Sequence, residues 1–270
     1  MDEATIERAD ETRRPTSRRP LRRITVIGVL GDLLLTAGVI TLLYVGWQLW
    51  IGDLIYAAQR NATGQELSQE WEQQYAAPAP GDAASDPVPS ETAEAEAPPA
   101  VEPIVLPEPA DAEIFGIMHI PRFGVDYQVP MAGGVSREHT LDPIGIGHYP
   151  DTAMPGAVGN FAVAAHRTTY GKPFNRIAEL HVNDAIIVET ADGWYTYRFR
   201  TLEYVTPDEV EVLLPVPQVP DAPPGSRYIT LTSCSPMFAM TERIVAYGVF
   251  ESFTPRAAGA PPALTDGVAA

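Results

Sequence analysis

The pattern of apolar and polar residues divides the chain into three parts. Residues 24–51 form an apolar run that only Asp32 and Gln48 interrupt, which is long enough for a helix to cross the roughly 30 Å hydrocarbon core of a bilayer. Residues 76–112 contain nine prolines, eight acidic residues and no Lys or Arg, a composition that buries too little apolar surface to fold. The pattern predicts a membrane helix, an unfolded tether, and a folded domain that begins near residue 112.

The folded domain is predicted to be mainly β. Segments rich in Val, Ile, Phe, Tyr and Thr follow residue 112, and turn signals separate them. Because most connections lack crossover helices, these segments favour a closed barrel or a sandwich over a parallel sheet. The expected strands are 113–120, 125–129, 160–165, 184–189, 193–205, 227–234 and 243–253. We also expect a short helix near 173–180, a polar helix at 57–75 and a long ordered loop at 206–226.

The membrane helix is predicted to be retained. Seven of the eighteen basic residues precede it, and Tyr44, Trp47 and Trp50 gather at its far end, where aromatic rings favour the interface. A cleavable signal peptide has a shorter apolar region of about 7 to 15 residues, followed by a small-residue cleavage site. Under the positive-inside rule the N-terminus lies in the cytoplasm and the rest of the chain outside the cell membrane.

These features together give five expected segments. They are a basic cytoplasmic N-terminus at 1–23, a transmembrane helix at 24–51, an extracellular juxtamembrane segment and linker at 52–111, a folded β-domain at 112–255 and a disordered tail at 256–270.

Charge removes one class of partner. The chain has a net charge of −17, whereas nucleic-acid binding depends on clustered Lys and Arg that neutralise phosphates. No nucleic acid is expected as a partner.

The one cysteine in the sequence, Cys234, stands at the end of a β-type segment. Alternation places Thr230 and Thr232 on its face of the strand, and Leu231 and Ser233 on the other. A lone cysteine in an exported chain forms no internal disulfide, so it is either a small buried apolar residue or a free thiol available for chemistry.

Two further residues give Cys234 a chemical context. His166 also ends an apolar β-type run, and Arg243 begins the β-type segment that follows Cys234. A thiolate nucleophile, a histidine acid and a cation that stabilises an oxyanion are the parts of a cysteine acyl-transfer site. Each residue also has an ordinary interpretation, since most arginines are simply solvated. The usual zinc patterns are missing from the sequence, so neither a metal nor another cofactor is expected.

These residues resemble the sortases, the cysteine transpeptidases of Gram-positive cell surfaces. The run Thr-Leu-Thr-Ser-Cys that ends at Cys234, with His166 upstream and Arg243 downstream, is similar to their Thr-Leu-x-Thr-Cys strand and its following arginine. The loop after His166, which contains Tyr170, is similar to that of the actinobacterial class E. Ser233 in place of the commoner Thr, and Ser235 where class E often has His, depart from the pattern.

The resemblance implies an eight-stranded sortase β-barrel with short helices. It implies that Cys234 attacks the Thr-Gly bond of a C-terminal LAxTG- or LPxTG-type sorting signal in a secreted protein and forms a thioester, with His166 as general acid and Arg243 steadying the oxyanion. An amine of a cell-wall precursor then resolves the thioester. Tyr170, Thr232 and Ser233 are the expected substrate contacts, and the apolar loop at 210–214 is expected to line the pocket for the leucine of the signal.

Two alternatives remain open at this point. An L,D-transpeptidase also uses Cys, His and Arg on a β scaffold, but it places glycine before the nucleophile and arginine two residues after it, where this chain has Ser233 and Pro236. A non-catalytic surface β-module that binds a protein partner would instead bury Cys234.

Overall fold

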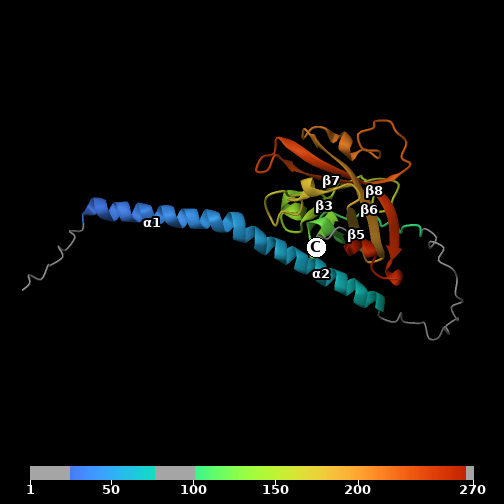
Figure 1. The fold of residues 1–270 in the computed structure, drawn as a ribbon, viewed down its shortest axis with the longest axis horizontal. Coiled ribbons are helices and arrows are strands. Elements are labelled where there is room, and N and C mark those ends of the chain that lie inside the picture. The colour runs from blue at the N-terminus through green and yellow to red at the C-terminus, as the bar shows by residue number, and fades with distance from the viewer. Residues whose placement is uncertain (1–24, 77–100, 266–270) are drawn as a thin grey trace, which may run out of the picture. The chain divides into compact units, whose positions relative to one another are not determined.

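The computed structural model describes residues 25–76 and 101–265, apart from the side chains of 48–50 (Figure 1). The chain divides after Gly46 into two compact units, and each is considered by itself. The basic N-terminus expected at 1–23 and the linker residues 77–100 lie outside the described residues.

The first unit contains one helix, α1 (Val26–Gly46), in which no residue is buried by other parts of the protein. By its length and apolar composition α1 is able to cross a membrane. The apolar run expected at 24–51 continues beyond it into a π-helical turn, η1 (Trp47–Gly52), which belongs to the second unit.

The second unit is built on a closed barrel of eight strands, in the order β1-β2-β3-β4-β7-β8-β6-β5. This confirms the predicted barrel. The strands are β1 (Ile114–His119), β2 (Gln128–Gly133), β3 (Ile146–His148), β4 (Gly159–Ala165), β5 (Ala185–Thr190), β6 (Gly193–Val205), β7 (Arg227–Ser235) and β8 (Glu242–Pro255).

Two strand predictions were wrong, and both concern short segments. β2 begins three residues later and ends four residues later than the strand expected at 125–129, because Met131 pairs in parallel with Ile146. β3 was missed, since three residues that include a glycine carry too little periodicity to be recognised. Only its pairing with β2 and β4 makes it a strand.

Alternation along the strands separates the barrel interior from its outer face. Phe161 and Val163 of β4, like Ile229 and Leu231 of β7, belong to the main apolar core. Cys234 is an odd number of positions from Leu231, so it lies with the outward-facing set. The prediction that the cysteine shares a face with hydroxyls rather than with apolar side chains is confirmed.

A second helix, α2 (Asp53–Ala76), lies along one side of the barrel (Figure 1). The predicted polar helix is confirmed, but its docking was not foreseen. At Gly64 an added Cβ atom would stand 2.2 Å from the carbonyl oxygen of Gln128 in β2. Further along, Ser68 donates to a carboxylate oxygen of Glu189 at 2.8 Å, and the ring of Trp71 faces the guanidinium of Arg256.

Both ends of the expected β-domain extend further than predicted. The expectation of an unfolded tether is wrong for residues 101–111, where Glu102 pairs with Arg227 at 2.9 Å and the carbonyl of Ile104 accepts from the hydroxyl of Tyr195. The expectation of a disordered tail is wrong through residue 265. Two 3₁₀ turns, η6 (Arg256–Ala258) and η7 (Pro262–Thr265), follow β8 there, and Ala263 packs on a small apolar cluster.

Candidate active site

Three neighbouring strands bring the expected catalytic residues together. The parallel pairing of β4 with β7 ends at Ala164 with Thr232, so continuing the register by two residues sets His166 level with Cys234. On the other side of β7, the antiparallel strand β8 pairs Arg243 with Cys234. Because neighbouring strands lie about 4.8 Å apart, the sequence-predicted cysteine, histidine and arginine gather at one edge of the barrel.

Cys234 is partly exposed, which agrees with a reactive thiol and differs from the buried thiol of a binding module. Thr232 shares its face but is only 4 % exposed, and its hydroxyl lies 3.0 Å from that of Tyr149 and donates to the carbonyl of Val163. Ser233 is on the opposite face, where its hydroxyl donates to the carbonyl of Ala165 at 2.7 Å. Of these two expected substrate contacts, only Thr232 lies on the face of the thiol.

His166 is held from two directions. Its Nε2 lies 2.6 Å from Oδ1 of Asp142, and its ring stacks on that of Tyr170 with 5.3 Å between the ring centroids. Burial lowers the pKa of the His166 imidazole below its usual value, although the hydrogen bond and charge of Asp142 act in the opposite direction. The imidazole is therefore neutral over most of the range near neutral pH, with Asp142 available to stabilise its protonated form.

Arg243 is partly exposed, and its side chain turns back onto its own hairpin. One of its guanidinium nitrogens, Nη1, donates to the carbonyl oxygens of Met240 and Glu242, at 3.1 Å and 2.9 Å. These bonds fix the guanidinium in the connection between β7 and β8, directly after the strand that carries Cys234.

The residue after His166 joins the two central strands. Arg167 is 8 % exposed, and its Nη1 donates to the backbone carbonyl of Cys234 at 3.3 Å. The side-chain amide of Asn175 donates in turn to the backbone carbonyl of Arg167 at 2.9 Å. The loop that leaves β4 is thus bonded directly to the end of β7.

The loop after His166 differs from its prediction. Instead of a helix over 173–180, it makes turns and a short 3₁₀ helix, η4 (Ile177–Glu179). The loop turns sharply at Tyr170, Gly171 and Lys172, which all have positive φ. Bulky residues rarely adopt this conformation, so tertiary contacts must hold the loop in this form.

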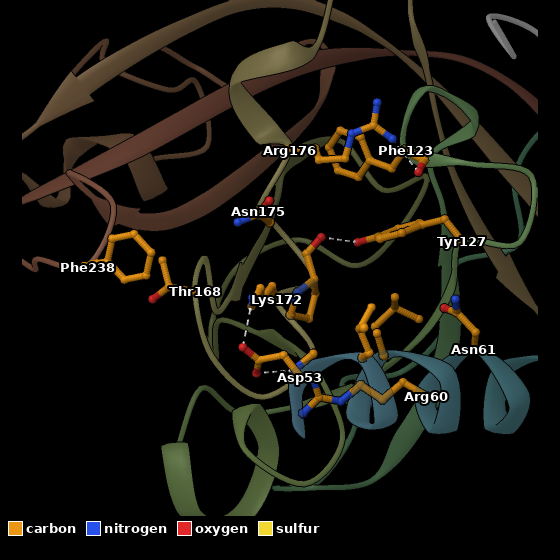
Figure 2. Close-up of a pocket in the computed structure, with 15 residues that line it drawn as sticks. Asp53, Arg60, Asn61, Phe123, Tyr127, Thr168, Lys172, Asn175, Arg176 and Phe238 are labelled. Atoms are coloured by element: carbon orange, nitrogen blue, oxygen red, sulfur yellow. Dashed lines mark hydrogen bonds and ion pairs between the residues drawn. The ribbon is translucent and has the colours of Figure 1, made fainter. Parts of the chain in front are cut away.

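A cavity of about 640 Å³ adjoins this loop. Figure 2 shows it lined by side chains from α2, from the loop after His166, from Phe123 and Tyr127, and from Phe238 in the connection between β7 and β8. The loop expected to hold the leucine of a signal does not line this cavity. In that loop, η5 (Val210–Leu213) packs Val212 on Val245 and Tyr247, on the outer face of β8.

Sequence reasoning missed three residues that contact the site. Asp142 and Arg167 lie in loops, and Arg60 lies in α2. No sequence motif distinguishes these three from other charged residues. A guanidinium next to His166 in the sequence was the only available signal for Arg167. In the described part of the chain, no group of three or more His, Cys, Asp or Glu residues is placed to hold a metal ion.

Comparisons with known proteins match this arrangement. A family model described as the sortase domain matches residues 118–251. The chain is 33 % identical to Sortase SrtE1 of Streptomyces coelicolor, over 97 % of this chain and 67 % of that protein. It is 28 % identical to Sortase SrtE2 of the same organism, over 86 % of this chain and 85 % of that protein.

Two solved structures are similar in sequence as well as in fold. The SrtA sortase from Actinomyces oris is 39 % identical with a TM-score of 0.57, over 60 % of this chain and 93 % of that one. Sortase E1 from Streptomyces coelicolor, solved with a tripeptide in its active site, is 40 % identical with a TM-score of 0.53, over 58 % of this chain and 99 % of that one.

Proposed function

Since this chain belongs to the sortase family of cysteine transpeptidases, we propose that it cleaves a C-terminal sorting signal of the LAxTG or LPxTG type between threonine and glycine. The acyl group held on Cys234 is then transferred to an amine of a cell-wall precursor. The observation that carries the proposal is the shared level of Cys234, His166 and Arg243 on three adjacent strands. Family membership sets aside the L,D-transpeptidase and the non-catalytic β-module.

The proposed reaction has two steps. In the first, Cys234 passes its thiol proton to His166, its sulfur bonds to the threonine carbonyl carbon, the bond from that carbon to the glycine nitrogen breaks, and His166 gives the proton to the departing amine. In the second, the acceptor amine attacks the thioester, its proton passes to His166, and the thiolate of Cys234 leaves. Each step passes through an oxyanion on the threonine carbonyl.

Arg243 is the proposed partner of that oxyanion. Its backbone lies opposite that of Cys234, and its guanidinium is anchored by the carbonyls of its own hairpin. A donor that is already fixed before the reaction stabilises developing charge without a cost of reorganisation.

The proposed substrate contacts are Tyr170, beside the imidazole, and Thr232, on the face of the thiol. Ser233 lies on the face of β7 opposite to the thiol, and its bond to Ala165 supports a role in joining β7 to β4.

The proposed setting is a membrane surface. Sortases are membrane-associated, and α1 has the length and composition of a single span. The arginines of residues 1–23 favour a cytoplasmic N-terminus, which would leave the barrel outside the cell. A secreted protein that bears a sorting signal and a membrane-linked acceptor would then meet the enzyme on one surface, at raised effective concentration.

A peptide assay tests the proposal. The full chain in detergent would be incubated with LAxTG and LPxTG peptides, with and without an amine, and analysed by mass spectrometry. We expect a thioester on Cys234, cleavage between threonine and glycine, and an amide product when the amine is present. The Cys234→Ala variant should keep its thermal unfolding temperature and lose all turnover. Unchanged turnover in that variant, or no acyl-enzyme with either peptide, would refute the proposal.

A further inference from the structure

One face of α2 contacts the loop that follows His166. Asp53 accepts from the backbone nitrogen of Gly171 and pairs with Lys172 at 2.9 Å, and Figure 2 shows the second of these contacts at the edge of the cavity. One turn later, the ring of Tyr56 lies 5.8 Å from that of Tyr170, which itself stacks on His166.

The same face approaches the loop too closely for any side chain at position 171. A Cβ atom there would stand 2.8 Å from the backbone nitrogen of Ala57. Asp53, Tyr56, Ala57 and Arg60 have the spacing of a single helix face. This face of α2 therefore forms a wall behind the loop of His166.

Arg60 extends this contact to the partner of the histidine. It is 5 % exposed, and its Nη2 donates to the carbonyl oxygens of Asp142 at 2.6 Å and Leu141 at 3.2 Å. The carboxylate of that same Asp142 holds Nε2 of His166 at 2.6 Å. Asp142 is thus held by α2 at its backbone carbonyl and holds the imidazole with its carboxylate.

We propose that Asp142 is a positioning residue for His166, and that α2 is a working part of the active site because Arg60 fixes the backbone of Asp142. This inference rests on the proposed function of His166 as general acid. On this proposal α2, which follows the membrane helix in the sequence, contributes to catalysis and is not only a spacer.

The contact with Asp142 also assigns a role to each nitrogen of the His166 imidazole. With Nε2 donating to Asp142, the neutral ring carries its proton on Nε2, and Nδ1 is the nitrogen that exchanges a proton with Cys234. If Asp142 were lost, the ring would be free to rotate or to change tautomer, and correctly oriented rings would become rarer. The loss would therefore appear in kcat more than in KM.

The charges around His166 predict the direction in which each substitution changes the pKa of its imidazole. The charged and titratable groups around His166 are Asp142 and Arg137 from the segment at 137–142, Arg60 from α2, Tyr170 from its own loop, and Cys234 and Arg243 from β7 and β8. Asp142 raises the pKa of His166, whereas Arg137 and Arg60 lower it. The fraction of enzyme present as thiolate and imidazolium rises with the pKa of the imidazole.

The first experiment measures kcat, KM and the pH dependence of kcat/KM for the full chain in detergent. Asp142→Asn should lower kcat by about 10- to 100-fold, a part of the roughly 10²- to 10⁴-fold effect of general acid–base catalysis, with little change in KM. Its acidic limb should move to lower pH. Arg137→Gln should move that limb to higher pH. The matched control Glu138→Gln, which removes an exposed carboxylate on the same turn, should change neither kcat nor the acidic limb.

Arg60→Met separates positioning from charge. Removing this cation alone would raise the pKa of His166, so a purely electrostatic role predicts equal or higher activity. A positioning role predicts a fall in kcat of about tenfold or more, since mispositioning by about 1 Å costs up to roughly 10²-fold. Gln59→Met, on the exposed side of α2, is the matched control and should retain wild-type kcat.

A measurement that leaves Asp142 and Arg60 in place tests the proposal even if the variants at these positions do not fold. In ¹⁵N-histidine spectra of full-length Cys234→Ala, assigned with a His166→Gln partner, neutral His166 should carry its proton on Nε2. A proton on Nδ1 would overturn the proposal, as would a folded Asp142→Asn with unchanged kcat and pH profile. Unchanged or raised kcat in folded Arg60→Met would overturn the role of α2. If wild-type enzyme forms no thioester with either peptide, the proposed function fails, and the spectra still decide the role of Asp142.

Discussion

The guanidinium of Arg167 donates to the backbone carbonyl of Cys234 at 3.3 Å, so the neighbour of the proposed general acid holds the backbone of the proposed nucleophile. The hydroxyl of Ser233 makes a second link between the same strands, to the carbonyl of Ala165. These two bonds join the ends of β4 and β7 and so set the spacing of the thiol and the imidazole independently of any substrate.

Replacement of Arg167 by methionine should therefore disturb catalysis more than folding. A hydrogen bond to a charged group contributes about 1.5–3 kcal/mol, and its loss would free the end of β7. We expect kcat/KM for the signal peptide to fall by about tenfold or more, with the barrel still folded by circular dichroism. Arg200→Met, which removes an exposed arginine bonded to Asn183, serves as the control. Equal activity of the two variants would argue against a role for Arg167.

The docking of α2 is tested at a position far from the thiol. In an isolated helix, Gly→Ala stabilises by about 1 kcal/mol, but at Gly64 the new methyl group would meet the carbonyl oxygen of Gln128 at 2.2 Å. Gly64→Ala should therefore lower the unfolding temperature and, by shifting α2, lower kcat.

The exposed position next to it supplies the comparison. Gln65→Ala changes helix propensity without contacting β2, so it should leave both the unfolding temperature and kcat near wild type. A higher unfolding temperature for Gly64→Ala would mean that α2 does not pack closely against the barrel in solution.

The sequence was sufficient for the barrel because its long strands carry strong local signals. The strand expected at 193–205 coincides with β6, β4 ends at Ala165 as expected, and β7 ends at Ser235, one residue beyond the expected end at Cys234. His166 and Cys234 could be proposed for the site because each follows or ends such a run, and because the motif around Cys234 resembles that of a known family.

The remainder of the site depends on contacts between distant segments. Asp142 meets His166 across 24 positions of the chain, and Arg60 meets Asp142 across 82. The propensity of α2 predicts a helix, but nothing in its own composition says that Gly64 and Arg60 face a barrel. Local periodicity cannot encode such pairings, which explains why the docking of α2 and the packing of the segment at 101–111 were not predicted.

A buried carboxylate far from the thiol should control the acid stability of the barrel. Glu189 is 1 % exposed, lies 2.8 Å from Nε2 of His119 and 2.9 Å from Nη2 of Arg256, and accepts from Ser68 of α2. These partners outweigh the effect of burial and lower the pKa of Glu189. Because the folded pKa is depressed, the stabilisation is present above the unfolded pKa and is lost as pH falls through the folded value.

Glu189→Gln should accordingly lower the free energy of unfolding at neutral pH by about 3–5 kcal/mol, as expected when one partner of a buried ion pair is removed. The difference from wild type should shrink below about pH 4, as the wild-type carboxylate becomes protonated. Denaturant titrations across this range measure it. Glu179→Gln, which removes an exposed partner of Arg176, should change stability by less than about 0.5 kcal/mol. A gap for Glu189→Gln that does not depend on pH would contradict the assignment.

Tyr170 links the imidazole to α2, and its ring is expected to matter more than its hydroxyl. The ring stacks on His166 and contacts that of Tyr56, while the backbone has a φ of 50°, which costs a non-glycine residue roughly 1–3 kcal/mol. Tyr170→Phe should therefore retain most activity, and Tyr170→Leu should lower kcat/KM by about tenfold, since an aromatic pair contributes about 0.5–1.5 kcal/mol beyond its buried area. Because Tyr170 is also a proposed substrate contact, the ratio of kcat/KM for LAxTG over LPxTG peptides should fall in Tyr170→Leu. An unchanged ratio with reduced kcat would restrict Tyr170 to supporting His166, and unchanged values of both would remove it from the site.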